Sequence, residues 1–171
     1  MFSAVVLVGP PGAGKSTIGA ELGRRGLRWR EWEQGILDRW GSRDAFVANK
    51  EHGLRLLHAD IEALIDTPGA PVVLETTGLS DATFLDRLAA ERRVLFVRCD
   101  VSRAAAGRRI AARPTGQHLS DEPADNRRIW DEFQAHVAPH RAVDLVIDTE
   151  TVAAATAAST IMGVLFPTAS G

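Results

Sequence analysis

Gly9-Pro-Pro-Gly-Ala-Gly-Lys-Ser-Thr17 is the stretch that decides how this chain folds. It matches the pattern Gly-x4-Gly-Lys-Ser/Thr, with Gly9, Gly14, Lys15 and Ser16 at the required positions. Glycine permits positive φ angles and lets the backbone approach a phosphate group where a Cβ atom would collide. The N–H groups of such a loop then point into one concavity at the positive end of the following helix. The stretch therefore predicts a phosphate-binding loop.

The segments around this loop fit the same prediction. Ser3–Val8 is a short apolar run rich in β-branched residues, which is typical of a central parallel strand buried on both faces. Lys15–Arg25 follows it as a helix. Chance alone would produce the bare pattern in about two of a thousand chains of this composition, so a simple glycine-rich turn explains it poorly. Lys15 is also one of only two lysines, against eighteen arginines.

Composition and charge narrow the classes of protein to which the chain can belong. The chain has 171 residues, which suits one domain over 1–171, and its net charge of −2 argues against a protein that grips nucleic acid or an anionic membrane. Cys99 is the single cysteine, so no internal disulfide can form. No apolar run approaches the roughly 20 residues that span a bilayer. We expect a cytoplasmic monomer or homodimer with no nucleic-acid or membrane partner.

Strands and helices alternate along the rest of the chain. Apolar runs predict strands at Pro71–Leu74, Val94–Val97 and Val143–Ile147, and the less apolar Leu27–Glu31 is predicted as a second strand nearer an edge. Helical spacing predicts helices at about Gln34–Trp40, Ala45–Ile65, Ala82–Ala90, Arg103–Ala111, Asp125–His136 and Thr151–Met162. Asp81 and Ser102 are suitable N-caps for two of them. Strands separated by helices of this length form βαβ units, so the fold class is α/β, with three layers and a parallel sheet.

Beyond the loop, the sequence resembles the small P-loop kinases of the shikimate kinase and gluconate kinase group over nearly its whole length. Gly26-Leu-Arg-Trp-Arg-Glu31-Trp-Glu33 is similar to their second strand, which ends in Asp-x-Asp. Arg113-Pro114 is similar to the Arg-Pro of their mobile lid, and Phe133 with Ala142–Thr149 resembles their Tyr-x-x-x-Ala-Asp strand. The resemblance implies a P-loop NTPase fold with strand order 2-3-1-4-5, helices on both faces, a lid over about 112–124, and ATP as donor.

The departures from that group concern the acceptor. Glu75-Thr76-Thr77-Gly78 stands where shikimate kinases carry three glycines, and Phe46-Val47 lacks the arginine of their acceptor-binding Phe-Arg. The acidic second-strand motif of gluconate kinases is absent as well. Val97-Arg98-Cys99-Asp100, with Gly107-Arg108 and Arg113, is similar to chloramphenicol phosphotransferase. The resemblance therefore implies phosphoryl transfer from ATP but does not identify the acceptor.

The donor side of the predicted site can be assigned residue by residue. Lys15 can reach the β- and γ-phosphates of ATP, and the Ser16 hydroxyl can ligate Mg²⁺. Arginines at a closing lid can neutralise the transferring phosphoryl group and stack on adenine. Arg113 fits this role better than Arg108 because its Pro neighbour matches the lid pattern. The predicted nucleotide-binding residues are Gly9, Gly12, Ala13, Gly14, Lys15, Ser16, Thr17, Arg109 and Arg113.

Three glutamates are candidates for metal and acceptor chemistry. Glu31 and Glu33 are predicted at the carboxyl end of the second strand, and Glu75 ends the third, where ligands of open α/β sheets bind. A carboxylate there can hold Mg²⁺ through water, orient the nucleophile or accept a proton. The alternatives are a solvated acidic turn and a helix cap. The predicted metal-associated residues are Ser16, Glu31 and Glu75, and the predicted catalytic residues are Lys15, Glu31, Glu33, Glu75 and Arg113.

Arginines and tryptophans near the predicted acceptor side indicate a function less specifically than the glutamates do. Arg127 and Arg128 can reach the acceptor from the helix after the lid, or be solvated surface residues. Trp29, Trp32 and Trp40 can line an apolar pocket, or simply pack the helices after the second strand. The five histidines show no metal-ligand spacing, which argues against zinc.

Two classes of function are open at this stage. The leading hypothesis is an ATP-dependent kinase that transfers the γ-phosphate to a hydroxyl of a small molecule. A nucleoside or nucleotide kinase is its main rival among enzymes, although no arginine-rich monophosphate site is clear after the second strand. The other class is a nucleotide-binding regulatory NTPase with a protein partner. Against it, the chain has no Asn-Lys-x-Asp motif for guanine, and a lid suits an enzyme that excludes water.

Overall fold

The sheet in the computed structural model is parallel and five-stranded, with the strand order β2-β3-β1-β4-β5. The structure describes residues 1–29, 32–114 and 122–167. The strands are β1 (Ala4–Val8), β2 (Arg28–Trp29), β3 (Val72–Thr76), β4 (Val94–Asp100) and β5 (Leu145–Asp148). The helices are α1 (Lys15–Arg24), α2 (Trp32–Trp40), α3 (Arg43–Ala48), α4 (Lys50–Asp66), α5 (Ala82–Glu91), α6 (Arg103–Ala111), α7 (Pro123–His136) and α8 (Ala154–Leu165). The predicted fold class and strand order are confirmed.

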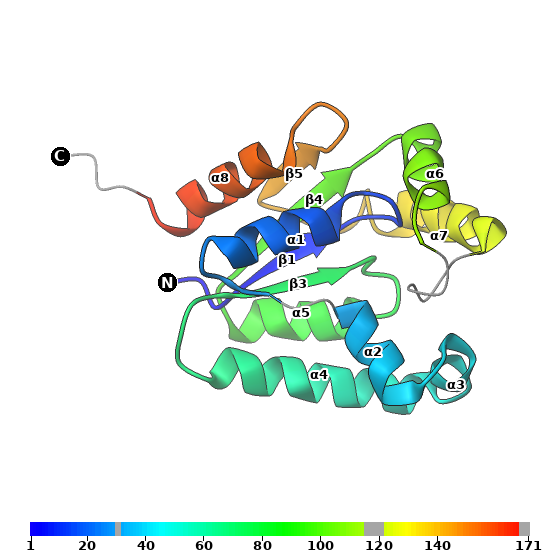
Figure 1. Cartoon of the computed structure of the whole chain (residues 1–171). Coiled ribbons are helices and arrows are strands. Elements are labelled where there is room, and N and C mark those ends of the chain that lie inside the picture. Colours follow the sequence, from blue (N-terminus) through cyan, green and yellow to red (C-terminus); the bar gives the residue numbers. More distant parts are fainter. Residues whose placement is uncertain (30–31, 115–121, 168–171) are drawn as a thin grey trace.

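Helices cover both faces of the sheet, so the fold has three layers (Figure 1). α1 and α8 lie on one face, and α4 and α5 lie on the other. Along the central strand β1, Val5 and Leu7 face the first layer, whereas Ala4, Val6 and Val8 face the second. All five are buried, as expected for a strand covered on both faces.

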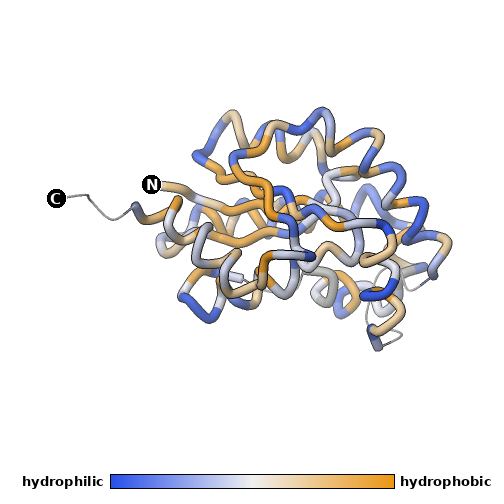
Figure 2. The backbone as a smooth tube through the Cα atoms, turned by 90° about the horizontal axis from the view of Figure 1, so that it is seen from above, coloured by the Kyte–Doolittle hydropathy of each residue, from blue (hydrophilic) through white to orange (hydrophobic). Residues whose placement is uncertain are grey.

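Hydrophobic residues are concentrated in the strands, which run through the middle of the molecule (Figure 2). Hydrophilic residues lie mainly on the helices and loops around them. In the described part of the chain, no helix combines the length and the apolar character that crossing a membrane requires.

The carboxyl ends of the parallel strands meet at one edge of the sheet. β1 runs into the predicted phosphate-binding loop at this edge, and its direct neighbours are β3 and β4. Glu75 of β3 pairs in register with Leu7 of β1, which pairs on its other side with Val97 of β4. The loop therefore lies between the ends of β3 and β4, where ligands of open α/β sheets bind.

Two helices replace the single one predicted over Ala45–Ile65. α3 ends at Ala48 and α4 begins at Lys50, because Asn49 leaves the helical region with φ −121° and ψ 26°. The Asn49 side chain donates to the Ala45 carbonyl at 2.9 Å. Short polar side chains compete with the helix for backbone groups in this way. The apolar spacing continues across the break, so the pattern alone does not reveal it.

The second strand begins one residue later than the predicted Leu27–Glu31, at Arg28. β2 spans Arg28–Trp29, and Glu31 lies outside the described residues. Glu33 lies in helix α2, and so it does not directly follow a strand. The last helix also begins later than predicted, at Ala154, because the residues after β5 form a turn first.

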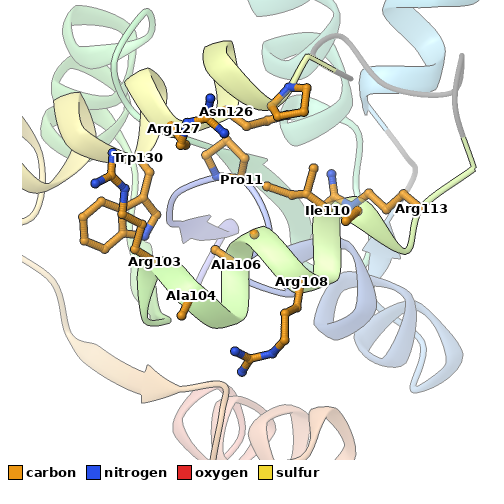
Figure 3. Close-up of a pocket in the computed structure, with 13 residues that line it drawn as sticks. Pro11, Arg103, Ala104, Ala106, Arg108, Ile110, Arg113, Asn126, Arg127 and Trp130 are labelled. Carbon is orange, nitrogen blue, oxygen red and sulfur yellow. The ribbon is translucent and has the colours of Figure 1, made fainter.

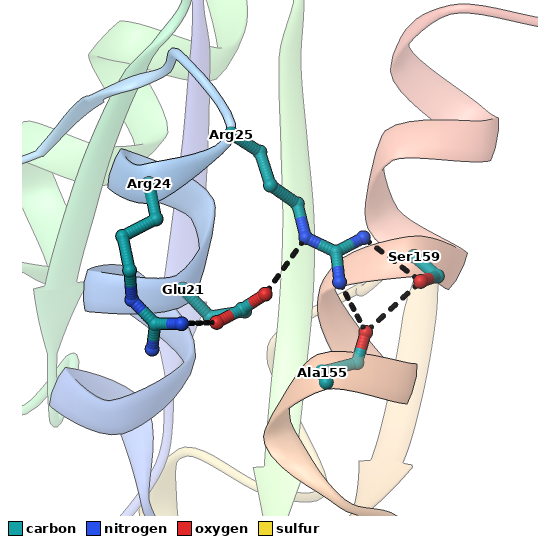
Figure 4. A network of polar contacts seen from close by, with 5 residues as sticks. All are labelled: Glu21, Arg24, Arg25, Ala155 and Ser159. Carbon is teal, nitrogen blue, oxygen red and sulfur yellow. Dashed lines mark hydrogen bonds and ion pairs between the residues drawn. The ribbon is translucent and has the colours of Figure 1, made fainter.

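A polar network joins α1 to α8 (Figure 4). Arg25 Nε donates to Glu21 Oε1 at 2.9 Å, and its Nη atoms donate to the Ser159 hydroxyl at 2.8 Å and the Ala155 carbonyl at 2.9 Å. Arg24 forms a second ion pair with Glu21. Because Glu21 is only 9% exposed, these partners offset the cost of burying its charge. The last helix is thereby fixed on the first.

We expect Gly19→Ala to destabilise the fold and Gly163→Ala not to. A Cβ atom on Gly19 of α1 would lie 2.2 Å from the indole Nε1 of Trp29, whereas one on Gly163 of α8 would meet nothing within 4 Å. Overpacking lowers the free energy of unfolding by about 1–3 kcal/mol. Alanine in place of an unstrained helical glycine raises it by about 0.5–1 kcal/mol. Urea unfolding of both variants measures the difference. Equal effects would mean that α1 does not pack this closely on Trp29.

Candidate functional site

The loop after β1 packs directly against β4 and α6. A Cβ atom on Gly9 would lie 2.7 Å from the Cys99 carbonyl oxygen, and one on Gly12 would lie 2.8 Å from the Ala106 carbonyl oxygen. Gly12 and Gly14 have φ angles of 79° and 77°, in the region that favours glycine. Gly14 is the N-cap residue of α1, so the loop ends at the positive end of that helix. The backbone thus has the shape and the helix terminus that phosphate binding uses.

Lys15 and Ser16, the first two residues of α1, have defined partners. Lys15 Nζ donates to the carbonyl oxygens of Gly9 at 2.8 Å and Pro10 at 3.0 Å, which holds the ammonium group over its own loop. Ser16 Oγ donates to Glu75 Oε2 at 2.7 Å. Two residues predicted to associate with metal are therefore in direct contact. In the described ranges, no group of three or more His, Cys, Asp or Glu side chains could hold a metal.

These groups line one end of a cavity of about 420 Å³. Its phosphate end is formed by loop residues 11–17 and by Glu75. Its other end has an apolar wall built from four helices, made of Ile36, Phe46, Leu54, Leu57 and Ile129. The rest of its lining is polar or charged and consists of Lys50, Thr76, Thr77, Ser80, Asp81, Arg113 and Asn126. The structure brings Lys15, Ser16, Glu75 and Arg113 to this one cavity.

Arg109 ties the loop to the segment after β5. One Nη atom donates to the Gly12 carbonyl at 3.1 Å and to the Thr149 hydroxyl at 2.9 Å, and the other donates to the Thr149 carbonyl at 2.6 Å. The Thr149 hydroxyl in turn donates to the Asp100 carbonyl at the end of β4. A guanidinium group fixed in this way offers a planar surface beside the loop, on which an aromatic base can stack.

A second cavity, of about 920 Å³, lies between α6 and α7 beside Pro11 of the loop (Figure 3). Arg113 lines both cavities, at the point where they adjoin. Arg127 lines this second cavity and not the smaller one. Arg128 pairs with Glu132 at 2.7 Å. Neither Arg127 nor Arg128 therefore reaches the acceptor side of the smaller cavity in this structure.

Asp81, for which the sequence predicts only a role as a helix cap, is a cavity residue. It occupies the N-cap position of α5, but its side chain makes no capping hydrogen bond. Instead, Oδ1 lies 3.0 Å from His58 Nε2, and Oδ2 accepts the Thr76 hydroxyl at 2.6 Å. Burial alone would raise the pKa of Asp81, but the hydrogen bonds of His58 and Thr76 and the charge of Lys50 hold it below its ordinary value. A local capping pattern gives no sign of these partners.

Trp29 and Trp40 serve packing. Trp29 lies against Gly19 of α1, and the Trp40 ring meets the Phe46 ring edge-on at a centroid distance of 6.4 Å. Neither tryptophan lines the smaller cavity. The side chains of Trp32 and Glu33, the whole of Glu31, and residues 115–121 of the predicted lid lie outside the described residues.

Solved structures of kinases match this chain over nearly its whole length. A shikimate kinase from Acinetobacter baumannii in complex with shikimate is 20% identical, with 95% of this chain and 92% of that chain covered and a TM-score of 0.67. A gluconokinase from Sinorhizobium meliloti is 19% identical, with coverage of 95% and 94% and a TM-score of 0.60. A deoxyadenosine kinase from M. mycoides with bound dATP is 19% identical, with coverage of 95% and 98% and a TM-score of 0.57.

These likenesses confirm the fold of the small P-loop kinases for this chain. They do so at low sequence identity, so they describe the fold and leave the acceptor open. No protein-family model matches the chain, and no curated protein sequence matches it either.

We expect Cys99 to be inert toward thiol reagents in the folded protein. It lies in β4 directly behind Gly9, and burial raises the pKa of its thiol to about 12. At pH 8 the folded thiol is therefore almost fully protonated, whereas the thiol of the unfolded chain is near its ordinary pKa and reacts. Labelling with a chromogenic disulfide, with and without urea, measures the contrast. Rapid labelling of the folded protein would mean that the loop does not cover β4.

Proposed function

We propose that this protein is an ATP-dependent kinase that transfers the γ-phosphate to a hydroxyl group of a small molecule. The observation that carries the proposal is one cavity that joins a phosphate-binding loop and the Ser16–Glu75 contact to an apolar wall. A nucleotide switch has no need of such a wall beside the terminal phosphate, whereas a kinase needs a second substrate there. The fold shared with kinases of small molecules supports the same function.

The donor half of the proposed reaction belongs to the loop and α1. Backbone N–H groups at the start of α1 would bind the phosphates of ATP. Lys15 would exchange its carbonyl partners for the β- and γ-phosphates. Arg109, fixed by its three hydrogen bonds, offers its guanidinium plane to the adenine ring. Arg113, which lines the same cavity, would add positive charge near the transferring phosphoryl group.

Ser16 and Glu75 fit the requirements of Mg²⁺, which binds hard oxygen ligands and keeps several of its waters. They supply a hydroxyl and a carboxylate oxygen 2.7 Å apart at the phosphate end of the cavity. Bound Mg²⁺ would neutralise charge on the β- and γ-phosphates. Ser16 would serve as a ligand, and Glu75 would accept hydrogen bonds from the waters around the ion.

The transfer exchanges one phosphorus–oxygen bond for another. The acceptor oxygen forms a bond to the γ-phosphorus while the bond from that phosphorus to the β–γ bridging oxygen breaks, and ADP leaves with the bridging oxygen. The hydroxyl proton passes to a carboxylate, for which Glu75 is the candidate at the phosphate end of the cavity and Glu31 and Glu33 are candidates from the sequence. The apolar wall limits the entry of water, which would otherwise hydrolyse ATP.

Lys15→Ala should abolish the activity. Wild-type protein with Mg-ATP is screened against polyols, hydroxy acids, hydroxy amino acids, sugars and nucleosides, and ADP release is followed. We expect one class of alcohol to stimulate ADP release, and the variant to lose at least about a hundredfold of that rate because a charge at the transferring phosphoryl group is lost. Arg55→Ala, on the exposed face of α4, is the control and should retain the activity.

Three results would change the assignment. A protein that binds no ATP, or whose ADP release is unaffected by Lys15→Ala, would contradict the kinase proposal. ATP binding without stimulation by any acceptor would favour the regulatory NTPase. Stimulation by nucleosides alone would favour a nucleoside kinase.

Glu75→Gln should raise the Mg²⁺ concentration needed for half-maximal activity. The amide keeps the size of the side chain and can still accept from Ser16, but it lacks the charge that attracts the ion. We expect an increase of at least about tenfold, since a charged contact of this kind contributes about 1.5–3 kcal/mol. A magnesium titration of ADP release measures it, with Glu132→Gln, a surface partner of Arg128, as the matched control. An unchanged midpoint would remove Glu75 from the metal site.

A further inference from the structure

The acceptor half of the 420 Å³ cavity carries two charged side chains that phosphate binding does not use. Lys50 begins α4 and Asp81 precedes α5, and both line the cavity beside its apolar wall. The charge of Lys50 also helps, after the hydrogen bonds of His58 and Thr76, to hold the pKa of Asp81 below its ordinary value. Charges of opposite sign in a small-molecule cavity indicate which charges its ligand carries.

Asp81 has capacity for a further hydrogen-bond partner. Its two carboxylate oxygens each have one partner in the described part of the chain, His58 at 3.0 Å and Thr76 at 2.6 Å. A carboxylate oxygen can accept two hydrogen bonds. The side chain is 19% exposed and lines the cavity, so a ligand can approach it. Its place at the start of α5 also favours a negative charge there.

His58 and Thr76 fix the orientation of this carboxylate. The His58 ring stacks on the Phe84 ring, with a centroid distance of 4.0 Å and an interplanar angle of 3°. The Thr76 hydroxyl accepts the Gly78 N–H at 2.9 Å, so its own proton is directed to Asp81. Side chains locked by their own packing and hydrogen bonds present a preorganised surface to a ligand. The Asp81 carboxylate is such a surface.

Lys50 is an unusual residue for this chain. The sequence contains two lysines against eighteen arginines, and both lysines line this cavity. In the described part of the chain, the ammonium group of Lys50 makes no hydrogen bond or ion pair. Lysine is a compact charge on a flexible stem, so it can meet a single anionic group on a small ligand. Lys15 lies at the phosphate end of the cavity, which leaves Lys50 for the acceptor.

We propose that the acceptor is a small hydroxylated zwitterion, whose ammonium group binds Asp81 and whose carboxylate or similar anionic group binds Lys50. This proposal rests on the kinase function proposed above. The apolar part of the molecule would lie on the wall that includes Leu54 and Leu57, with its hydroxyl toward the phosphate end. An ammonium group suits Asp81 better than a neutral hydroxyl does, because the attraction between opposite charges is added to the hydrogen bond. Hydroxy amino acids are the simplest molecules of this class.

A matched set of alcohols separates the two charges. L-Homoserine carries both, 4-hydroxybutyrate lacks the ammonium group, 3-aminopropan-1-ol lacks the carboxylate, and propan-1-ol lacks both. L-Serine and the longer 5-hydroxy-L-norvaline, each with its own analogues, test other chain lengths. ADP release from Mg-ATP is measured for each alcohol. We expect at least one zwitterion to exceed both of its single-charge analogues by at least about tenfold in kcat/KM.

Two substitutions assign each charge to its residue. Lys50→Met alters an exposed side chain, so it leaves the fold intact, and it should remove only the preference for the zwitterion over the amino alcohol. Asp81→Asn should remove only the preference for the zwitterion over the hydroxy acid. Arg55→Met and Asp66→Asn neutralise surface charges outside the cavity and should change neither preference.

His58 is a positioning residue in this arrangement, because it acts through Asp81. His58→Gln keeps a donor for the carboxylate and should retain most of the affinity for the zwitterion. His58→Leu removes the donor and should raise KM by about tenfold with little change in kcat. If both variants instead lose kcat and gain KM to the same extent, the role of His58 is merely structural.

ATP binding separates a failure of this proposal from a failure of the kinase function. If the protein binds ATP and a neutral or singly charged alcohol stimulates ADP release as well as any zwitterion does, the kinase function stands and the zwitterion proposal is wrong. The proposal is equally wrong if ATP binds and no zwitterion stimulates, or if both preferences survive Lys50→Met and Asp81→Asn. If ATP does not bind at all, both proposals fall.

Discussion

The close packing of the loop after β1 against β4 and α6 is the constraint on which the rest of the structure depends. Gly9 and Gly12 approach two carbonyl oxygens so closely that a side chain at either position would collide. That approach is possible only if β4 lies directly beside β1. Because β3 occupies the other side of β1, its Glu75 lies within hydrogen-bond distance of Ser16 at the start of α1. The central order β3-β1-β4 is thus the one in which a single loop meets both neighbours.

The same constraint couples the donor site to the hydrophobic core. Cys99, whose carbonyl group contacts the loop, is fully buried in the layer under α1 and α8. Arg109 adds a second connection, since it joins the Gly12 carbonyl to Thr149 after β5. The loop is therefore anchored to β4 by close packing and, through the Arg109 side chain, to the segment after β5. A site held in this way is positioned by the sheet and changes little when surface side chains change.

How much the sequence predicts depends on how local each signal is. β1, the loop and α1 are consecutive, and their local pattern predicts all three, while the α/β fold class follows from the alternation of strands and helices along the chain. The break at Asn49 escaped prediction because apolar spacing continues through it, while its cause is one side-chain hydrogen bond to Ala45. Asp81 was assigned to a helix cap because capping is a local pattern. Its actual partner, His58, lies 23 residues earlier, and only tertiary structure brings the two together.

The two halves of the cavity differ in how their residues are distributed along the sequence. This difference explains why the donor half is easier to predict than the acceptor half. The donor half comes mainly from consecutive residues 11–17, so any change there acts directly on phosphate binding. The acceptor half takes one or a few residues from each of α2, α3, α4 and α7 and from the segment before α5. Residues on separate helices can be exchanged one at a time while the sheet stays intact. One fold can then serve a shikimate kinase, a gluconokinase and a deoxyadenosine kinase. The acceptor of this chain therefore has to be inferred from the charges of Lys50 and Asp81, and not from the fold.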